Sequence, residues 1–562
     1  MIQLSESQKY AFDYIVENLP TKKVILLEGS AGTGKTTLTK YICNYYNEKK
    51  NTLVCAIAPT HKSKKVIKNI LNQNTIIPIS AFTVASALGK IKEHSYVGTK
   101  QYTNGNIKKL SSYKLFIVDE VSMIKDSDLK IIVDYVNKTN KQLLIIGDSN
   151  QIPCPSAKYI VSNIIEKADS YVFTDEKIDK VKLTITVRQN EDSPIIKLAT
   201  FVRDNLLNDF TFDKIIDSTN FTNVIQYSDT YSIFKQHFNI EEVNSCRIIA
   251  YTNSAVKMHN MEVRDCLGYK DVFVVGELMT GYTNIGWPDL IIENGEDYII
   301  KNICPTTTHR IGTFKNLSGN LIDMIVSDNS SKVKIRNLFF INIHSSNNTT
   351  FIMRLIELAE KINELNSTKL DYRNYMELKN CVVFTEDVYK YEGKIFTETT
   401  FKETHPLLFV NINEVITGNQ IIRSLLSKKI NTTYPEIVQQ RMDDKHKPLG
   451  DSETFADKYK VIEKDINYGY SITAHKSQGS TYNTALVDEP DFQKISNRWN
   501  YKYDKLETRV KEKNQLRYVA YTRAKSNLYL IYQDKENDMD MDMDMEYEVD
   551  EPEYEEVSYE NE

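Results

Sequence analysis

A glycine-rich octapeptide near the N-terminus has the composition of a phosphate-binding loop. Residues 29–36 read Gly-Ser-Ala-Gly-Thr-Gly-Lys-Thr and follow directly on a short apolar run, residues 24–27. Glycines let successive backbone N–H groups curl around phosphate oxygens, and the start of the following helix adds its positive dipole. Lys35 is then placed to neutralise the β- and γ-phosphates, and the Thr36 hydroxyl to ligate Mg²⁺. The residues expected to contact the nucleotide here are Gly29, Ser30, Ala31, Gly32, Thr33, Gly34, Lys35, Thr36 and Thr37.

Two adjacent carboxylates supply the acidic partner that such a loop requires. Asp119 and Glu120 come directly after four apolar residues, at the expected C-terminal end of a buried strand. We expect Asp119 to hold the Mg²⁺ shell and Glu120 to orient and deprotonate the attacking water. A solvated surface pair is the alternative, but it does not account for the apolar run. The two motifs together predict an NTPase and no more.

Three further side chains are candidates for the γ-phosphate side of the site. Gln151 follows another apolar run, where its amide is placed to reach the γ-phosphate and report its state. Arg188 and Arg523 lie downstream of the first core, and either is a candidate arginine finger. Taken singly, each arginine is more often a surface residue, so the residues alone leave this role open.

The elements that must position these side chains are short, continuous apolar runs. They lie at residues 24–27, 53–58, 115–118 and 143–146, and polar segments of helical length separate most of them. Continuous runs are typical of parallel strands that are buried on both faces. The pattern therefore predicts an α/β fold with a doubly wound parallel sheet. A second α/β pattern begins near residue 247 and resumes after residue 465.

Two segments depart from the α/β pattern and are predicted to be insertions. Residues 96–106 carry β-formers and an Asn-Gly turn signal, which favours a small hairpin. The long segment between the halves of the second pattern is β-rich. The expected division is a first core at 1–80 and 113–185, a hairpin insertion at 81–112, a second core at 186–260 and 465–535, a β-rich insertion at 261–464, and a disordered acidic tail at 536–562.

Composition narrows the class of protein. Of the net charge of −6, residues 534–562 contribute −14, so the remaining body carries about +8. A basic body is compatible with a phosphate-backbone binder or with a mildly basic enzyme that has a solubilising tail. The seven cysteines are scattered without a Cys-x-x-Cys pair, which argues against a zinc site or a disulfide framework. We expect no membrane segment and a reducing, intracellular location: cytoplasm or nucleus, or host cytoplasm if the abundant Asn, Lys, Ile and Tyr reflect a viral source.

Taken in order, the motifs resemble those of superfamily 1 helicases, particularly the Dda and RecD branch, which generally moves 5′ to 3′. The resemblance covers both cores, roughly residues 1–260 and 465–533. It implies two RecA-like P-loop motor domains, with a β-hairpin insertion in the first and a barrel-like β insertion in the second. The matching segments are residues 4–8, 29–37, 58–62, 118–123, 147–153, 183–188, 473–480 and 518–524.

The resemblance also implies roles for individual residues. Gln8 is expected to read adenine, which makes ATP the nucleotide. The expected γ-phosphate contacts are Gln151, Arg188, Gln478, Gly479 and Arg523. The expected contacts to a DNA strand, mainly to its backbone, are Pro59, Thr60, His61, Thr83, Thr473 and His475. For the two histidines, a purely structural role is the alternative.

Two departures from the family pattern affect the expected DNA contacts. Ala85 stands where the family often has a histidine. The matching segment at residues 147–153 runs on as Pro153-Cys154-Pro155, where the family has adjacent prolines. In this family the hairpin insertion acts as a pin that splits the duplex. Tyr102 is the candidate aromatic wedge, with Tyr96 as the alternative, although in a chain with 35 tyrosines a packing role competes.

The resemblance predicts an ATP-dependent DNA helicase or translocase that moves along single-stranded DNA and opens forks. An RNA-directed helicase, a translocase that strips proteins, and an inactive motor-fold scaffold are the alternatives. Intact Lys35, Asp119 and Glu120 argue against the scaffold. The expected partners are single-stranded and fork DNA. A single-strand-binding or replisome protein is a further candidate partner, through residues 261–464 or the acidic tail.

Overall fold

The computed structural model describes most of both predicted cores and part of the β-rich insertion. Arg188, Tyr96, the Asn104-Gly105 pair, most of residues 300–460 and the acidic tail lie outside the described residues. The described residues are 4–73, 75, 77–94, 100–103, 110–154, 158–161, 164–167, 169–185, 193–282, 292–305, 307–311, 314–326, 334–342, 381–384, 389–391, 394–396, 466–500 and 505–533. No helix within these ranges is both long enough and apolar enough to cross a membrane.

The first core is built on a six-stranded sheet whose strands are all parallel, in the order β10-β1-β7-β6-β2-β3. The four apolar runs predicted as strands all belong to it. The strand bounds are β1 Val24–Gly29, β2 Val54–Ala58, β3 Ser80–Thr83, β6 Leu115–Val118, β7 Gln142–Gly147 and β10 Asp179–Leu183. β3 continues the sheet past residue 80, so the first core extends beyond the division expected there.

Helices cover both faces of this sheet, as a doubly wound fold requires. Alternate residues of β1 face opposite ways: Ile25 and Leu27 lie in one apolar cluster, whereas Val24 and Leu26 lie in another. The first cluster is covered by α1 (Glu6–Lys22), α2 (Lys35–Asn44) and α3 (His61–Leu71). The second is covered by α5 (Asp126–Lys138). Burial on both faces explains why the strand sequences are continuously apolar.

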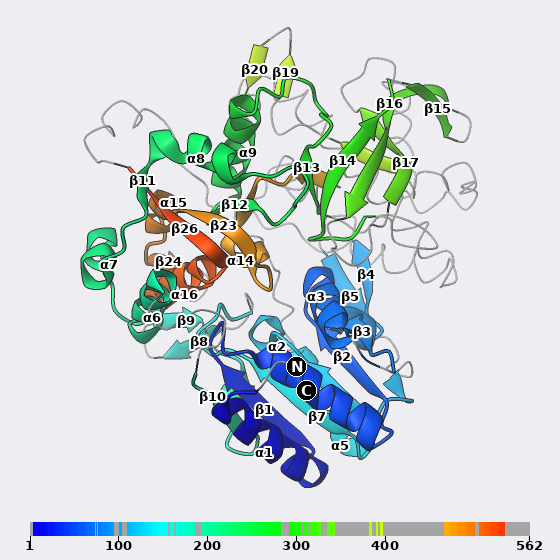
Figure 1. Ribbon diagram of the computed structural model, residues 1–562, viewed down its shortest axis with the longest axis vertical. Helices are drawn as coiled ribbons and strands as arrows, with labels where there is room; N and C mark the ends of the chain where they lie inside the picture. The colour runs from blue at the N-terminus through cyan, green and yellow to red at the C-terminus, as the bar shows by residue number, and fades with distance from the viewer. Residues whose placement is uncertain are drawn as a thin grey trace.

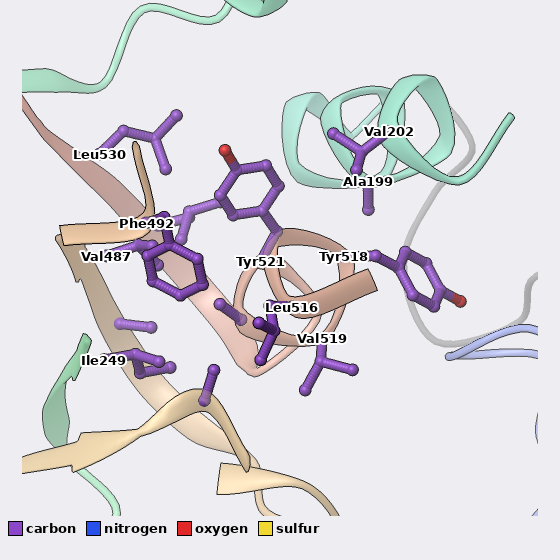
Figure 2. Packing of buried hydrophobic residues seen from close by; sticks show 14 of the residues in the cluster. Ala199, Val202, Ile249, Val487, Phe492, Leu516, Tyr518, Val519, Tyr521 and Leu530 are labelled. Atoms are coloured by element: carbon purple, nitrogen blue, oxygen red, sulfur yellow. The ribbon is translucent and has the colours of Figure 1, made fainter. Parts of the chain in front are cut away.

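The second core repeats this plan with a five-stranded parallel sheet in the order β11-β26-β23-β12-β22 (Figure 1). Its strands are β11 Val224–Gln226, β12 Cys246–Ala250, β22 Ser471–Thr473, β23 Tyr482–Asp488 and β26 Ala524–Tyr532. One face packs against α6 (Pro194–Asp204), α7 (Phe212–Thr219) and α16 (Val510–Tyr521), in the cluster drawn in Figure 2. The other face packs against α8 (Thr230–His237) and α9 (Asn253–Cys266). The expected pair of RecA-like domains is thus confirmed.

The insertion in the second core is β-rich, as predicted. Seven of its described strands form one sheet in the order β18-β17-β16-β14-β13-β21, with β15 paired to β16, and within this sheet only the β17–β18 pair is parallel. The bounds are β13 Leu278–Gly281, β14 Asp297–Ile303, β15 Thr307–Ile311, β16 Phe314–Val326, β17 Lys334–Asn342, β18 Cys381–Phe384 and β21 Ile466–Tyr468. β19 (Tyr389–Tyr391) and β20 (Lys394–Phe396) form a separate antiparallel pair. Apolar residues of β13, β14 and β21 join the cluster under α8 and α9, which fixes the insertion to the second core.

A two-stranded antiparallel hairpin is present in the first core. It consists of β4 (Ile91–His94) and β5 (Lys100–Thr103), and Tyr102 pairs with Lys92. The strands are therefore linked through residues 95–99, and Asn104-Gly105 follows the second strand instead of connecting the two. The prediction that Asn104-Gly105 forms the turn of this hairpin was therefore wrong. The first strand, β4, lies before residues 96–106, the segment from which the hairpin was predicted.

A small sheet that we did not expect joins the two cores. Its order is β24-β25-β9-β8, with β8 at Lys158–Val161, β9 at Ile164–Lys167, β24 at Arg498–Asn500 and β25 at Lys505–Glu507. β8 and β9 lie between β7 and β10 in the chain, whereas β24 and β25 precede α16. The parallel β9–β25 pairing matches Leu506 with Ile164 and Glu507 with Ile165. The chain passes from the first core to the second between β10 and α6. The β9–β25 pairing adds backbone hydrogen bonds between the cores to this covalent link.

Candidate nucleotide site and nucleic-acid interface

The glycine-rich loop lies where the sequence predicts, between the end of β1 and the start of α2. Gly32 and Gly34 adopt left-handed φ angles of 83° and 78°, which only glycine tolerates without strain. The Lys35 ammonium donates to the carbonyl oxygens of Gly29 at 2.5 Å and Ser30 at 3.0 Å. The lysine therefore lies across the mouth of the loop, where a phosphate oxygen would compete for it.

Gln8 lies directly behind this loop. Its side chain is 4% exposed, and its Nε2 donates to the carbonyl oxygen of Thr33 at 3.2 Å. Its Oε1 accepts from the backbone N–H of Ser5 in a capping box that starts α1. Its Nε2 therefore joins the loop to α1, and its Oε1 is used in the cap of that helix. Adenine recognition by Gln8 stays a prediction.

The acidic pair follows β6 on the adjacent part of the sheet edge. Asp119 Oδ1 accepts from the backbone N–H of Glu120 at 3.0 Å, and Glu120 has a left-handed φ of 51°. Burial and the neighbouring Glu120 carboxylate raise the pKa of Asp119 to about 7, and Lys35 opposes the shift. The carboxylate oxygens of Asp119 and Glu120 and the hydroxyl of Thr36, at the start of α2, are the hard oxygen donors that Mg²⁺ prefers. The residues present therefore fit a Mg²⁺ site.

Gln151 forms the first direct link between the two cores. It is 4% exposed, and its Oε1 accepts from Nε2 of Gln478 at 3.0 Å. Its carbonyl oxygen accepts from Nε2 of Gln515, on α16, at 3.1 Å. Two residues expected at the γ-phosphate side therefore meet across the cleft, and Gln515 is a third that the sequence did not single out.

Tyr518 forms a second link, which sequence reasoning missed. Its hydroxyl oxygen accepts from the backbone N–H of Ala31 at 2.9 Å, and its proton is donated to Asp148 Oδ2 at 2.9 Å. Burial and Asp148 raise the pKa of this hydroxyl, so it stays protonated as a donor. From α6, Arg203 Nη1 donates to Ser30 Oγ at 3.2 Å. The second core therefore contacts two residues of the phosphate loop.

Arg523 follows α16 and is buried, at 6% exposed. It donates to the carbonyl oxygens of Val519 at 2.9 Å and Ser480 at 3.0 Å, which are both in the second core. Burial lowers the pKa of its guanidinium, and the Glu120 carboxylate of the first core opposes this shift. Arg523 thus lies close enough to feel the acidic pair while it is held by its own core. Its role as an arginine finger stays a prediction, as does that of Arg188, which lies outside the described residues.

The predicted DNA-binding residues start short helices at the ends of strands. The hydroxyls of Thr60, Thr83 and Thr473 each accept a hydrogen bond from a backbone N–H three residues later. They cap α3, α4 (Val84–Ala87) and α14 (Ala474–Ser477), respectively. Pro59 precedes the first of these caps, and the ring of His475 lies 6.4 Å from that of Tyr251. The threonines therefore have a structural role, and strand contact by all five residues stays a prediction.

Two of these motif segments touch each other across the cores. Gly479, after α14, has a left-handed φ of 77°, and a Cβ atom there would lie 3.5 Å from the Cβ of Ser63 on α3. The sequence placed Gly479 at the γ-phosphate side. The structure places it against the helix that starts at Thr60, so the two candidate grips are in contact.

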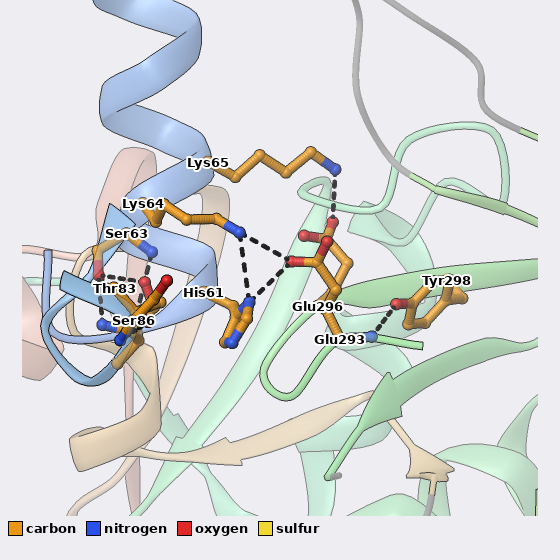
Figure 3. A network of polar contacts seen from close by, with 10 residues as sticks. His61, Ser63, Lys64, Lys65, Thr83, Ser86, Glu293, Glu296 and Tyr298 are labelled. Atoms are coloured by element: carbon orange, nitrogen blue, oxygen red, sulfur yellow. Dashed lines mark hydrogen bonds and ion pairs between the residues drawn. The ribbon is translucent and has the colours of Figure 1, made fainter. Parts of the chain in front are cut away.

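His61 faces an acidic turn of the insertion, which we define as residues 293–297 (Figure 3). Its Nδ1 lies 3.2 Å from Glu293 Oε2, and Lys64 Nζ lies 3.7 Å from the same oxygen. Lys65 pairs with Glu296 at 3.1 Å. The basic start of α3, predicted to contact a DNA strand, is therefore engaged with carboxylates in this structure. No local sequence signal indicates a contact between residues 232 positions apart.

A buried ion-pair group anchors the same turn. Asp297 Oδ2 accepts from Lys62 Nζ at 2.9 Å and from Arg247 Nη2 at 2.9 Å, and Asp297 Oδ1 accepts from Thr280 Oγ1 at 2.6 Å. The side chains of Asp297 and Arg247 are 3% and 0% exposed. Burial tends to raise the pKa of Asp297, but the cationic Arg247 and Lys62 side chains outweigh this and hold the pKa below its ordinary value. The first core, the second core and the insertion meet at this carboxylate.

Comparison with known proteins agrees with this geometry. A family model described as an AAA domain matches residues 3–212. The ATP-dependent DNA helicase Dda of Enterobacteria phage T4 is 30% identical over 289 residues, covering 49% of this chain and 60% of Dda. The RecBCD enzyme subunit RecD of Buchnera aphidicola is 28% identical over 276 residues, covering 44% of this chain and 42% of RecD. These matches span less than two thirds of either relative.

Among solved structures, the Pif1 helicase from Candida albicans aligns with a TM-score of 0.44 and 14% identity, covering 95% of each chain. Residues 3–212 thus match the AAA domain model, and about half of the chain is similar in sequence to the Dda helicase and to RecD.

Proposed function

We propose that this protein is an ATP-driven motor that moves along single-stranded DNA and opens duplex DNA. The observation that carries the proposal is the set of contacts between the cores around the phosphate loop. The first core supplies the loop and the acidic pair, and the second core contacts the loop through Tyr518 and contacts Gln151 through Gln478 and Gln515. A nucleotide bound to that loop would lie where both cores can respond to it.

Each residue then has a step in hydrolysis. Lys35 and the loop N–H groups bind the phosphates of the substrate ATP. Thr36 and Asp119 would hold Mg²⁺, which would supply positive charge to balance the phosphate oxygens. Glu120 orients the attacking water and accepts its proton. Arg523, and Arg188 with it, stabilise charge on the transferring phosphoryl from the second core.

Movement follows from a difference between the nucleotide states. ATP draws the second-core residues toward the γ-phosphate, and hydrolysis removes that contact, so the cleft closes and opens once per cycle. The DNA grips lie on both cores: Thr60, His61 and Thr83 on the first, and Thr473 and His475 on the second. Alternate release of these grips yields net movement, for which the family resemblance favours the 5′ to 3′ direction. Fork DNA is the proposed duplex substrate, in replication, recombination or repair.

The test is the ATPase rate with and without single-stranded DNA, comparing wild type with Lys35→Ala. Strong stimulation that the substitution abolishes, while DNA binding persists, supports the motor. Parallel reactions with single-stranded RNA decide the nucleic acid, since stimulation by RNA alone would make this an RNA-directed motor. A wild type that binds DNA but is stimulated by neither nucleic acid would contradict the proposal and leave a binding scaffold.

A further inference from the structure

Tyr518 occupies a position that the hydrolysis steps above do not use. Its hydroxyl bridges two groups of the first core: the Ala31 N–H within the phosphate loop and the Asp148 carboxylate after β7, each at 2.9 Å. The residue is 2% exposed, and Asp148 is 1% exposed. Figure 2 shows Tyr518 at the edge of its apolar cluster, with its hydroxyl pointing away from the other labelled side chains.

The hydroxyl takes a place that a phosphate oxygen would take. N–H groups of the phosphate loop are hydrogen-bond donors for phosphate oxygens, and an acceptor atom already lies on the one from Ala31. The tyrosine oxygen and a phosphate oxygen are alternatives there, because one N–H makes one good hydrogen bond. Tyr518 must therefore release Ala31 when a phosphate group takes that N–H.

Release would be transmitted through α16, which is the helix that carries Tyr518. Gln515 lies one turn earlier on the same helix and bonds the carbonyl oxygen of Gln151, and Arg523 follows the end of the helix. Asp148 in turn accepts from both nitrogens of Asn150, next to Gln151, through its Oδ1. Loss of the bridge therefore weakens the attachment of α16, the helix that precedes Arg523, to the segment that contains Gln151, which the Gln515 bond still contacts.

We propose that Tyr518 is a positioning residue that senses whether the γ-phosphate side of the loop is filled. Its hydroxyl links the two cores while it holds the Ala31 N–H, and a phosphate oxygen that takes this N–H exchanges the bond for one to phosphate. The exchange couples the phosphate loop to the second-core DNA grip that α14 carries. This inference rests on the proposed function, since it assumes that ATP binds this loop.

The test uses the full chain with Tyr518→Phe, which removes only the hydroxyl. Tyr521→Phe is the matched control: it is the same change one turn later on α16, where the buried hydroxyl donates to Glu489 of the second core. Two quantities are measured for each protein. They are the KM for ATP, and the ratio of the single-stranded DNA affinities with and without a non-hydrolysable ATP analogue.

Tyr518→Phe should lower the KM for ATP by about 2- to 10-fold, because the competing hydrogen bond is lost. The effect of the nucleotide on DNA affinity should shrink with it, since the free protein already populates the nucleotide-like state. Tyr521→Phe should leave both quantities as in wild type. Asp148→Asn, which weakens the same bridge without removing the hydroxyl, should shift both quantities in the direction of Tyr518→Phe.

An unchanged KM and an unchanged affinity ratio in Tyr518→Phe would overturn the inference, as would identical changes in Tyr518→Phe and Tyr521→Phe. The latter would show that any lost hydroxyl in α16 acts through stability alone. Both outcomes leave the proposed function standing if wild type shows DNA-stimulated hydrolysis. A wild type without that stimulation instead contradicts the motor, and the two failures are thus distinguishable.

Discussion

Gln478 of the second core donates a 3.0 Å hydrogen bond to Gln151 of the first, and both side chains are buried. The bond joins the two segments that were expected to sense the γ-phosphate. We expect Gln151→Ala and Gln478→Ala each to lower the DNA-stimulated kcat at least about tenfold, roughly 1.4 kcal/mol. The double variant should lose less than the sum, with a coupling of about 0.5–3 kcal/mol, because the residues act together. Strictly additive losses, measured in steady-state ATPase assays, would contradict this coupling.

The acidic turn should compete with DNA for α3. Glu293→Gln removes the charge that faces His61 and Lys64. We expect tighter binding of single-stranded DNA at low salt, by about 2- to 5-fold, and convergence with wild type at high salt, as for any screened interaction. Fluorescence anisotropy measures both. Glu241→Gln makes the same charge change at an exposed pair with Lys301 and should leave the affinity as it is. Weaker or equal binding by Glu293→Gln would show that the turn does not compete.

The same contact should depend on pH in a defined direction. The hydrogen bond with His61, supported by Lys64, lowers the pKa of Glu293 in the folded protein, while burial opposes this. A lowered folded-state pKa means that the contact contributes stability above the ordinary glutamate pKa of about 4.3. That contribution is lost as pH falls through the lowered value. The difference in the free energy of unfolding between wild type and Glu293→Gln should be present at pH 7, under about 1 kcal/mol in size, and vanish in acid. Denaturant titrations at each pH measure it. A difference that grows in acid would contradict the assignment.

Asp297 should be a large contributor to stability. Asp297→Asn removes the charge that Arg247 and Lys62 share in a nearly inaccessible site. An uncompensated buried cation typically costs about 3–5 kcal/mol, so we expect a lower midpoint in urea denaturation followed by tyrosine and tryptophan fluorescence. Asp209→Asn is the control: Asp209 pairs with Lys513 at 2.8 Å with its side chain 66% exposed. Similar midpoints for the two variants would show that the buried group is not needed for folding.

A substitution at Tyr102 should distinguish movement along the strand from opening of the duplex. The hairpin β4–β5 carries it opposite Lys92. If an aromatic ring at this position stacks on the last base pair, Tyr102→Ala should spare DNA-stimulated ATPase and weaken unwinding of a forked duplex by about 1–3 kcal/mol per base of stacking lost. Tyr102→Phe keeps the ring and should unwind as wild type does. Equal loss of ATPase and unwinding in Tyr102→Ala would rule out the wedge.

The sequence predicts those parts of the fold in which the type of each residue depends on its local surroundings, such as burial or backbone conformation. β1, β2, β6 and β7 each contain a continuous apolar run because both faces are covered, and the phosphate loop needs glycine at Gly32 and Gly34 for its left-handed turns. β10 has alternating burial at the sheet edge, so its sequence lacks the continuous apolar pattern.

Contacts between segments that are distant in the chain have no comparable signal in the local sequence. Tyr518 lies inside a recognised motif, but in the sequence it cannot be told apart from a core tyrosine such as Tyr521 on the same helix. Arg203 occupies a position on α6 that many surface arginines share. His61 was assigned to DNA because its motif favours it, while its acidic neighbour Glu293 is brought to it only by the packing of the insertion.

The small sheet shared by the two cores has a mechanical consequence. While the β9–β25 backbone hydrogen bonds hold, the strands of both cores are fixed to each other at that edge of the cleft. This pairing limits sliding of the cores past each other at this edge and leaves rotation about it as the freer movement. For the proposed motor, the length of one step would then depend on how far α3 and α14 lie from this edge.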